Sequence, residues 1–334
     1  MVGAFLITIY VAISTILHYI QQKLTGTTKK KMILTEEHIE LVAKEVLQWP
    51  SSRKWNSSDK DRRIRSFFGA PSNVVADLWN RIRDRGGLED GAKPKHLLWA
   101  LVFLKNYSPI EILCSIVGWP STKTFSKWAW YFVERISEMK DDLIKLENRF
   151  DGLDGVAERS CFISVDGTDC PVYEPSLFDR KMYLHKLNGP GVKYEVAVCI
   201  KTAKIVWING PFIASKNDTT IFTEGLSHLL YDDEGIEVDK GYRGDNKMKR
   251  PGMGISHDDR KMKSNARAQH EIVNGQLKNF GVLNTHFRHI KSNREGMMRK
   301  NKLCFNAVAV ITQLKFIFGE LIFAKEFDYN VAYW

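Results

Sequence analysis

The stretch Cys161-Phe-Ile-Ser-Val-Asp166-Gly-Thr-Asp169 decides the fold that this chain is expected to adopt. Its first five residues are apolar or small and include β-branched and aromatic side chains, so they predict a buried strand over 161–165 that ends at Asp166-Gly167. Alternating apolar and polar residues over 193–200 and 204–212 predict two further strands. Strands that alternate with helical segments indicate an α/β fold.

The segment that follows extends this pattern. In order, we expect a helix over 219–231, a short strand over 236–238 that ends at Asp239, a polar loop over 243–259, and helices over 265–280 and 301–323. The sequence therefore predicts an α/β domain with a mixed central sheet over residues 155–325.

The residues before this domain predict helices only. Apolar side chains at helical spacing occur over 35–47, 74–83, 96–105, 109–117 and 121–139. The glycine- and aspartate-rich segment that begins at Asp151 is typical of a domain boundary. We expect an all-helical domain over 31–150.

Length and composition limit the classes of protein to which the chain can belong. Its 334 residues correspond to about two domains. Lys and Arg number 49 against 39 Asp and Glu, a net charge of +10, which favours a polyanionic partner. The apolar and charged fractions, 44% and 26%, exclude wholesale disorder. The five cysteines are dispersed, so neither a zinc site nor a disulfide framework is indicated.

The N-terminal segment over residues 1–20 carries no charged side chain and is followed by the lysines at 29–31. Twenty apolar residues are about the length that spans a bilayer core, so a membrane anchor is one interpretation. The alternatives are an amphipathic helix packed on the body of the protein, or an extension that is not native to the folded domain. The anchor is the less favoured interpretation.

Three acids stand at decisive places in the predicted fold. Asp166 and Asp239 end two expected strands, and Glu271 lies within the helix expected over 265–280. In an open α/β sheet, functional groups gather beyond the carboxyl ends of the strands, so we expect these acids to meet. Converging carboxylates repel one another, and hard cations such as Mg²⁺ or Mn²⁺ relieve the repulsion. Two such ions can clamp the oxygens of an in-line phosphoryl displacement.

Basic side chains surround the third acid. Arg267 and Lys278 lie four residues before and seven residues after Glu271, on the same expected helix face. Residues 240–302 hold 16 basic and five acidic side chains, and this set includes Lys240 and Arg243. Such a charge concentration would neutralise DNA phosphates. Taken singly, each residue is more simply explained as a turn residue or a solvated surface charge.

Together, these motifs resemble the DDE transposases, and most closely the PIF/Harbinger group and its relatives among bacterial insertion sequences. The resemblance rests on Val-Asp166-Gly-Thr-Asp, Val-Asp239-Lys-Gly-Tyr-Arg-Gly and Arg267-x3-Glu271-x6-Lys278, and it covers about residues 161–316. Ser264 stands where those relatives often have a tyrosine. The resemblance implies an RNase H-like fold in which Asp166, Asp239 and Glu271 are the catalytic acids that bind two divalent ions, Mg²⁺ or Mn²⁺.

Residues 109–128 predict a helix, a glycine turn at Gly118 and a second helix capped by Ser121. Phe125 and Trp128 would pack inward. The side chains expected to face the major groove of DNA are Thr122, Lys123 and Lys127. The alternative is an ordinary helical hairpin whose lysines are solvated.

The leading hypothesis is a metal-dependent DNA transposase or endonuclease, a hydrolase that cleaves and joins DNA phosphodiesters. The alternative is a domesticated, catalytically silent DNA-binding protein, and a third hypothesis is a membrane-anchored protein with another use for the scaffold. From the resemblance we also expect a separate Myb-like DNA-binding partner and a nuclear location, which the lysines at 29–31 support weakly. Homo-oligomerisation is left open.

Overall fold

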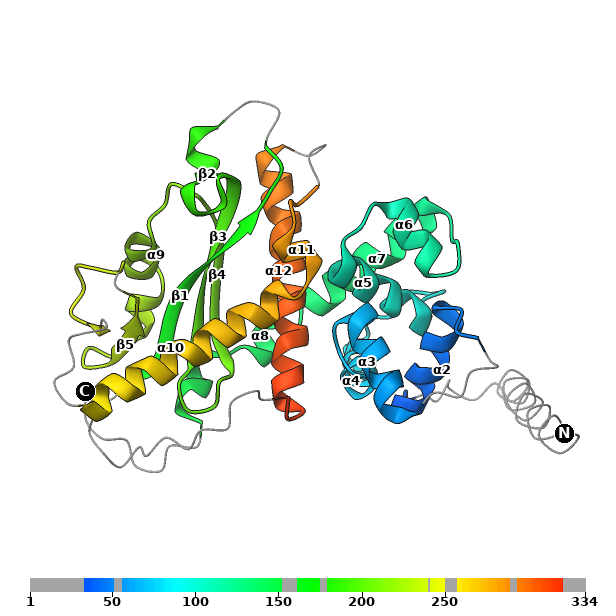
Figure 1. The fold of residues 1–334 in the computed structure, drawn as a ribbon, viewed down its shortest axis with the longest axis horizontal. Coiled ribbons are helices and arrows are strands. Elements are labelled where there is room, and N and C mark those ends of the chain that lie inside the picture. Colours follow the sequence, from blue (N-terminus) through cyan, green and yellow to red (C-terminus); the bar gives the residue numbers. More distant parts are fainter. Residues whose placement is uncertain are drawn as a thin grey trace, which may run out of the picture. The chain divides into compact units, whose positions relative to one another are not determined.

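The computed structural model describes residues 33–50, 56–151, 161–174, 179–239, 241–249, 257–288 and 293–320 (Figure 1). Residues from Thr35 onward belong to one compact unit, which is the one described here. The apolar segment over 1–20 and the lysines at 29–31 lie outside the described residues. In the described ranges, no helix combines the length and the apolar character that crossing a membrane requires.

The first half of the unit consists of helices only, as predicted. They are α2 (Glu36–Val46), α3 (Ser57–Phe68), α4 (Ser72–Asp84), α5 (Pro94–Asn106), α6 (Ile110–Ile116), α7 (Thr122–Ser137) and α8 (Lys140–Leu143), followed by the 3₁₀ turn η1 (Leu146–Phe150). The five predicted helices are confirmed, with ends shifted by one or two residues. The predicted boundary falls largely on residues 152–160, which lie outside the described residues.

Helices α2 and α3 show why one was predicted and the other was missed. The hydroxyl of Thr35 accepts the N–H of His38 at the start of α2, and Ile39, Ala43 and Val46 form its buried stripe. In α3 only Ile64 and Phe68 are buried, and charged side chains occupy most of the other positions. The only apolar residues of α3 are Ile64, Phe67 and Phe68, all in its last five positions, which is too short a stretch to establish helical periodicity in a sequence.

A mixed, open sheet forms the second half. Its strands are β1 (Cys161–Pro171), β2 (Tyr183–Leu184), β3 (Gly189–Cys199), β4 (Ile205–Ile213), β5 (Gly235–Val238) and β6 (Met248–Lys249). β3 pairs antiparallel with one edge of β1 and also pairs antiparallel with β4. β5 pairs parallel with the other edge of β1, and β6 pairs parallel with β5. The predicted α/β class with a mixed sheet is confirmed.

Helices cover both faces of this sheet (Figure 1). They are α9 (Asp218–Glu224) with the 3₁₀ turn η4 (Leu226–Leu229), α10 (His257–Lys278), α11 (Gly281–Asn284) and α12 (Arg294–Ile317). Thr168 on β1 bonds to Asn274 of α10, and Tyr194 on β3 bonds to Asn301 of α12. Thr168 and Tyr194 are partners in the β1–β3 register, so α10 and α12 lie on the same face.

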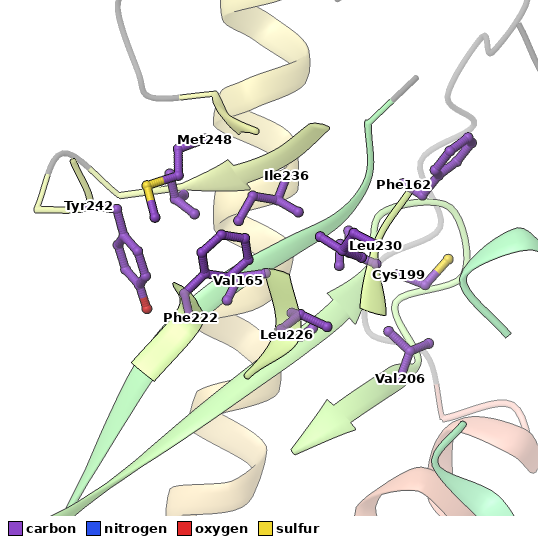
Figure 2. Packing of buried hydrophobic residues seen from close by; sticks show 13 residues of the cluster. Phe162, Val165, Cys199, Val206, Phe222, Leu226, Leu230, Ile236, Tyr242 and Met248 are labelled. Atoms are coloured by element: carbon purple, nitrogen blue, oxygen red, sulfur yellow. The ribbon is translucent and has the colours of Figure 1, made fainter. Parts of the chain in front are cut away.

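The other face packs against α9 and η4. Val165, Phe222, Leu226 and Ile236 are members of one buried cluster, and Tyr242 lies at its edge (Figure 2). Burying each large apolar side chain contributes about 1.5–3 kcal/mol relative to leaving it exposed. Because neighbouring residues of a strand point to opposite faces, Val165 faces this core whereas Asp166 faces α10.

Two sequence predictions about this half are wrong in detail. β1 does not end at Asp166 but continues to Pro171, because β3 remains paired with it over that length. The helix predicted over 219–231 is interrupted at Gly225, where α9 ends and η4 begins. In addition, the loop predicted over 243–259 contains β6, and α10 begins within it at His257.

Candidate active site

Asp166 and Asp239 lie side by side where the pairing of β1 with β5 ends. The last parallel pair is Val165 with Val238, and the two aspartates are the next residues of their chains. β5 stops here while β1 runs on, so an opening forms beside Asp166. The carboxyl ends of parallel strands are where open α/β sheets bind ligands. The expected meeting of these acids therefore has a structural basis, although Asp166 itself is mid-strand.

Glu271 reaches the same opening from α10. The hydroxyl of Thr168 donates to Asn274 Oδ1 at 3.0 Å and fixes the helix across the strand. Glu271 lies three residues earlier on α10, one turn nearer the opening. A cavity of about 490 Å³ is lined by Asp166, Asp239 and Glu271 together. Three elements that are distant in sequence thus bring their acids to one cavity, while their predicted joint binding of metal ions stays a prediction.

The three acids differ in their exposure to water. Asp166 lies deepest, while the side chains of Asp239 and Glu271 are 45% and 69% exposed. Burial raises the pKa of the Asp166 carboxyl to about 6. The N–H of Gly167 and the charge of Lys186 oppose this shift, whereas the charges of Asp239 and Asp218 add to it. The ionised form of Asp166 is therefore held in an unfavourable environment.

Arg267 lies between the other two acids. One guanidinium nitrogen is 2.9 Å from Asp239 Oδ1, and Nε is 3.6 Å from Glu271 Oε1. The i, i+4 spacing predicted to place Arg267 and Glu271 on one helix face is confirmed. Among the described residues, no group of three or more His, Cys, Asp or Glu side chains is arranged to hold a metal ion. At the cavity, the Arg267 guanidinium instead contacts both Asp239 and Glu271.

The donor chemistry of the cavity nevertheless fits a hard divalent cation. Its acids offer carboxylate oxygens, the ligands that Mg²⁺ and Mn²⁺ prefer. The described residues give Asp166 an N–H bond from Gly167 but no salt bridge, so its buried charge would gain most from a cation. The residues that would hold such an ion are Asp166 and Asp239, and Glu271 joins them if Arg267 swings away.

Lys278 is held by the protein itself. Its ammonium donates to the carbonyl oxygens of Asp169 and Leu283, and it also lines the cavity. These bonds tie the end of α10 to β1. A phosphate would have to compete with two carbonyl acceptors for this side chain, so the predicted DNA contact of Lys278 stays a prediction.

The other basic residues proposed near the third acid are placed as follows. Arg243 is exposed, and its backbone N–H donates to Thr219 Oγ1 at 3.3 Å, beside the start of α9. Lys240 lies outside the described residues. Lys186, which the sequence analysis did not select, is exposed and lines the cavity next to Asp166. Only the folded chain brings Lys186 to this place, since nothing in its local sequence marks it.

Three residues on the opposite face of β1 were not predicted from the sequence: Asp218, Tyr242 and Glu195. Besides burial, the charge of Asp218 raises the pKa values of both Asp166 and Glu195, and the charges of these acids raise the pKa of Tyr242. Asp218 follows the N-cap residue Asn217, whose side chain accepts the N–H of Thr220. Its position therefore indicated only a helix start. A register between β1 and β3 was needed to bring Glu195 beside Gly167.

His270 also lines the cavity. Its side chain is 2% exposed, and burial lowers its pKa to about 4, so the imidazole is neutral, which is the form that can ligate a metal. It lies on the face of α10 that packs on β1, where the backbone of Ser164 acts on its pKa.

The α6–α7 pair has the local features predicted for it. Gly118 has a φ of 88°, and the N–H of Trp119 donates to the carbonyl of Cys114 at 2.8 Å. Thr124 N–H donates to Ser121 Oγ at 3.1 Å, which caps α7. Phe125 and Trp128 are buried, as predicted. The turn, the cap and the inward packing are thus confirmed.

The three side chains predicted to face DNA are exposed on α7. Thr122 and Lys123 are open to solvent. Lys127 lies 3.0 Å from Glu89 Oε1 and 4.7 Å from the centre of the Trp128 ring, so its charge already has partners. DNA binding by the α6–α7 pair therefore stays a prediction.

Comparisons with known proteins add no identification: no family model matches the chain, and neither do curated proteins or solved structures.

Proposed function

We propose that the chain is a metal-dependent DNA endonuclease or transposase of the DDE type, with Asp166, Asp239 and Glu271 as its acids. One observation carries the proposal: these acids come from a strand, the end of a second strand and a helix, and line one cavity. The mixed sheet with helices on both faces is compatible with the RNase H-like fold that the resemblance implies.

Asp166 and Asp239, with Glu271, would hold the divalent ions. Mg²⁺ or Mn²⁺ bound there would supply Lewis acidity toward the phosphodiester oxygens. The chain's own part is to supply anionic oxygens on a rigid strand edge and to keep Asp166 partly shielded from water. The pKa of about 6 keeps Asp166 ionised at pH 7 and above.

Cations of the chain would orient the DNA backbone at the cavity. Arg267 lies at its rim with 46% of its side chain exposed, and Lys186 lies beside Asp166. A phosphate that enters could take the guanidinium from the two carboxylates, because charge-assisted bonds from Arg to phosphate are strong and bidentate. Release of Arg267 would free Asp239 and Glu271 at the same time.

Incubation of supercoiled plasmid with the full chain tests the proposal. We expect nicking in the presence of Mg²⁺ or Mn²⁺ and none in EDTA. Asp166→Asn should abolish nicking, whereas the matched exposed variant Asp232→Asn should nick like the wild type. Equal nicking by Asp166→Asn and wild type would contradict the proposal.

A second function, DNA binding without cleavage, is favoured by one observation. Arg267 pairs with Asp239 and Glu271, so these two acids are compensated without a metal. Such an arrangement suits a domesticated, catalytically silent protein. Retention of plasmid DNA by the wild type without nicking in Mg²⁺ or Mn²⁺ would support this function over the first.

The helical half would contact DNA through Thr122 and Lys123 in either case. The nuclear location and the Myb-like partner belong to the same proposal, because both follow from the resemblance, and homo-oligomerisation stays open. Co-purification from nuclear extract with a tagged chain, followed by identification of Myb-type proteins, tests the partner directly.

A further inference from the structure

A fourth acid lies on the face of β1 opposite α10. Asp218 is the first residue of α9, and its Oδ1 is 3.1 Å from the position that a Cβ atom at residue 167 would occupy. Because residue 167 is glycine, the carboxylate packs directly against the strand next to Asp166. Any side chain at residue 167 would require this carboxylate to move.

Asp218 and Asp166 share a second cavity. It has a volume of about 370 Å³, and Asp166, Asp218, Asp239 and Tyr242 are among its lining residues. Asp166 and Asp239 also line the first cavity, so they are accessible from both faces of the sheet edge. Such access is possible because β5 ends at Val238 and leaves the edge of β1 uncovered beyond it.

The hydroxyl of Tyr242 is the second, independent feature of this cavity. Tyr242 is 3% exposed, and within the described part of the chain its hydroxyl has no hydrogen-bond partner. Its ring lies at the edge of the core cluster in Figure 2. A buried hydroxyl without a partner is unfavourable, and native structures contain few of them.

The surroundings of this hydroxyl are acidic. Asp218, Asp166 and Asp239 line the same cavity as Tyr242. The phenol keeps its proton at neutral pH, because a tyrosine hydroxyl ordinarily titrates near pH 10. A neutral hydroxyl among carboxylates can both donate and accept hydrogen bonds, which is what the water shell of a bound cation requires.

Lys193 offers a purely structural explanation for Asp218. Its ammonium is 3.3 Å from Asp218 Oδ1, and the Asp218 side chain is 40% exposed. Ion pairs this exposed contribute little to stability, typically less than about 1 kcal/mol. The pair also leaves Tyr242 without a partner and leaves the burial of Asp166 uncompensated. A small divalent cation would meet both needs.

We propose that Asp218 and Asp166, together with the Tyr242 hydroxyl, form a second cation position at the uncovered edge of β1, open to the α9 side and additional to the ions placed in the Asp166–Asp239–Glu271 cavity, which takes a hard divalent ion such as Mn²⁺ or Mg²⁺. Mg²⁺ commonly uses one or two protein carboxylates and keeps several waters, so two acids suffice. The inference rests on the proposed function for the role of Asp166 and extends it by assigning a fourth acid.

Calorimetric titration of the EDTA-treated full chain with Mn²⁺ tests this assignment. Asp218→Asn should weaken Mn²⁺ binding at one position by about 10- to 100-fold, the range found when supports of a metal site are removed. Gly167→Ala should weaken it less, since the new Cβ displaces the Asp218 carboxylate without removing it. Asp232→Asn, which changes an exposed acid, should bind like the wild type.

Thermal unfolding separates this role from a structural one. Mn²⁺ should raise the Tm of the wild type, because a ligand that binds only the folded state stabilises it. If Asp218 binds the cation, Asp218→Asn keeps the cation-free Tm and shows a smaller rise with Mn²⁺. If Asp218 serves only to pair with Lys193, the variant has a lower cation-free Tm and an unchanged rise, which would overturn the proposal.

The outcomes also separate this proposal from the proposed function. Wild-type Mn²⁺ binding that is lost in Asp166→Asn but unchanged in Asp218→Asn overturns the second position and leaves the nuclease proposal standing. If Asp218→Asn binds Mn²⁺ more weakly than the wild type, but the wild type does not nick DNA, the second cation position is supported and the nuclease proposal is contradicted. A wild type that binds no Mn²⁺ contradicts both.

Discussion

The cavity beside Asp166 and the α6–α7 pair are both predicted functional regions, and they are stabilised in opposite ways. In α6–α7 the glycine turn, the Ser121 cap and the buried Phe125 all favour the observed fold. Around the cavity, burial raises the pKa values of Asp166 and Glu195, so ionised side chains there oppose folding. The residues of the α6–α7 pair are thus explained by their contribution to folding. Asp166 and Glu195, in contrast, lower the stability of the folded protein when they are ionised.

Unfavourable placement of charge is characteristic of functional sites. If that interpretation of the cavity is right, removing a charge there should stabilise the cation-free protein. Removing a charge from α7 should leave its stability unchanged. The predictions below measure this difference.

Glu195→Gln should give the largest change in stability. Glu195 is 1% exposed, one carboxylate oxygen accepts the Trp207 indole N–H at 2.9 Å, and the other has no partner among the described residues. Burial raises its pKa to about 7 from the ordinary 4.5, and the charge of Asp218 adds to the shift. Stability that is fully present below about pH 4.5 is therefore lost as the pH rises through 7.

The glutamine variant does not titrate, so it should avoid this loss. Urea unfolding in EDTA should show nearly equal stabilities at and below pH 4.5 and a variant that is more stable by about 3 kcal/mol at pH 8, from about 1.4 kcal/mol per unit over the pKa shift from 4.5 to about 7. A variant less stable than the wild type at pH 8 would mean that the charged carboxylate is compensated in the fold.

Asp166→Asn should give a smaller effect of the same sign, because this side chain is only partly buried. Its pKa is raised from the ordinary 3.8 to about 6, so its contribution to stability is complete below pH 3.8 and is lost as the pH rises through 6. We expect the variant to be about 2–3 kcal/mol more stable than the wild type at pH 8 in EDTA, from about 1.4 kcal/mol per unit of pKa shift. Excess Mn²⁺ should reverse the order, since only the wild type gains a bound cation at this position.

Much of this comparison was predictable from the sequence, and the reasons are local. Thr35, Gly118 and Ser121 form caps and turns with residues at most four positions away, so spacing alone identifies them. The apolar runs of β1, β3 and β4 likewise predicted a sheet. The motifs around Asp166, Asp239 and Glu271 further indicated that the acids share one site, and they line one cavity.

The missed features depend on pairings between distant segments. The continuation of β1 past Asp166 follows from its pairing with β3, and the opening beside Asp166 follows from the early end of β5. Asp218 reaches Asp166 only because Gly167 lets α9 approach the strand. Arg267 was expected to bind phosphate, but its contact with Asp239 depends on where α10 crosses β5. None of these relations has a local sequence signal.

The smallest expected effects lie on α7, where Lys123 and Lys127 form a matched pair. Both side chains are exposed, but Lys127 is paired with Glu89 at 3.0 Å and Lys123 has no salt bridge among the described residues. If α7 enters the major groove, Lys123→Ala should lower DNA affinity and reduce the slope of log K against log salt by about 0.9, the value for one phosphate contact. Lys127→Ala should change the slope less. In the wild type, Lys127 must give up its ion pair with Glu89 to bind a phosphate, and the loss of that pair offsets part of the gain in binding. Neither variant should alter the free energy of unfolding by more than about 0.5 kcal/mol, as is usual for surface positions.

Fluorescence anisotropy at several salt concentrations measures the slopes. Equal slopes for both variants and the wild type would show that neither lysine contacts a phosphate and would contradict DNA binding by this face of α7.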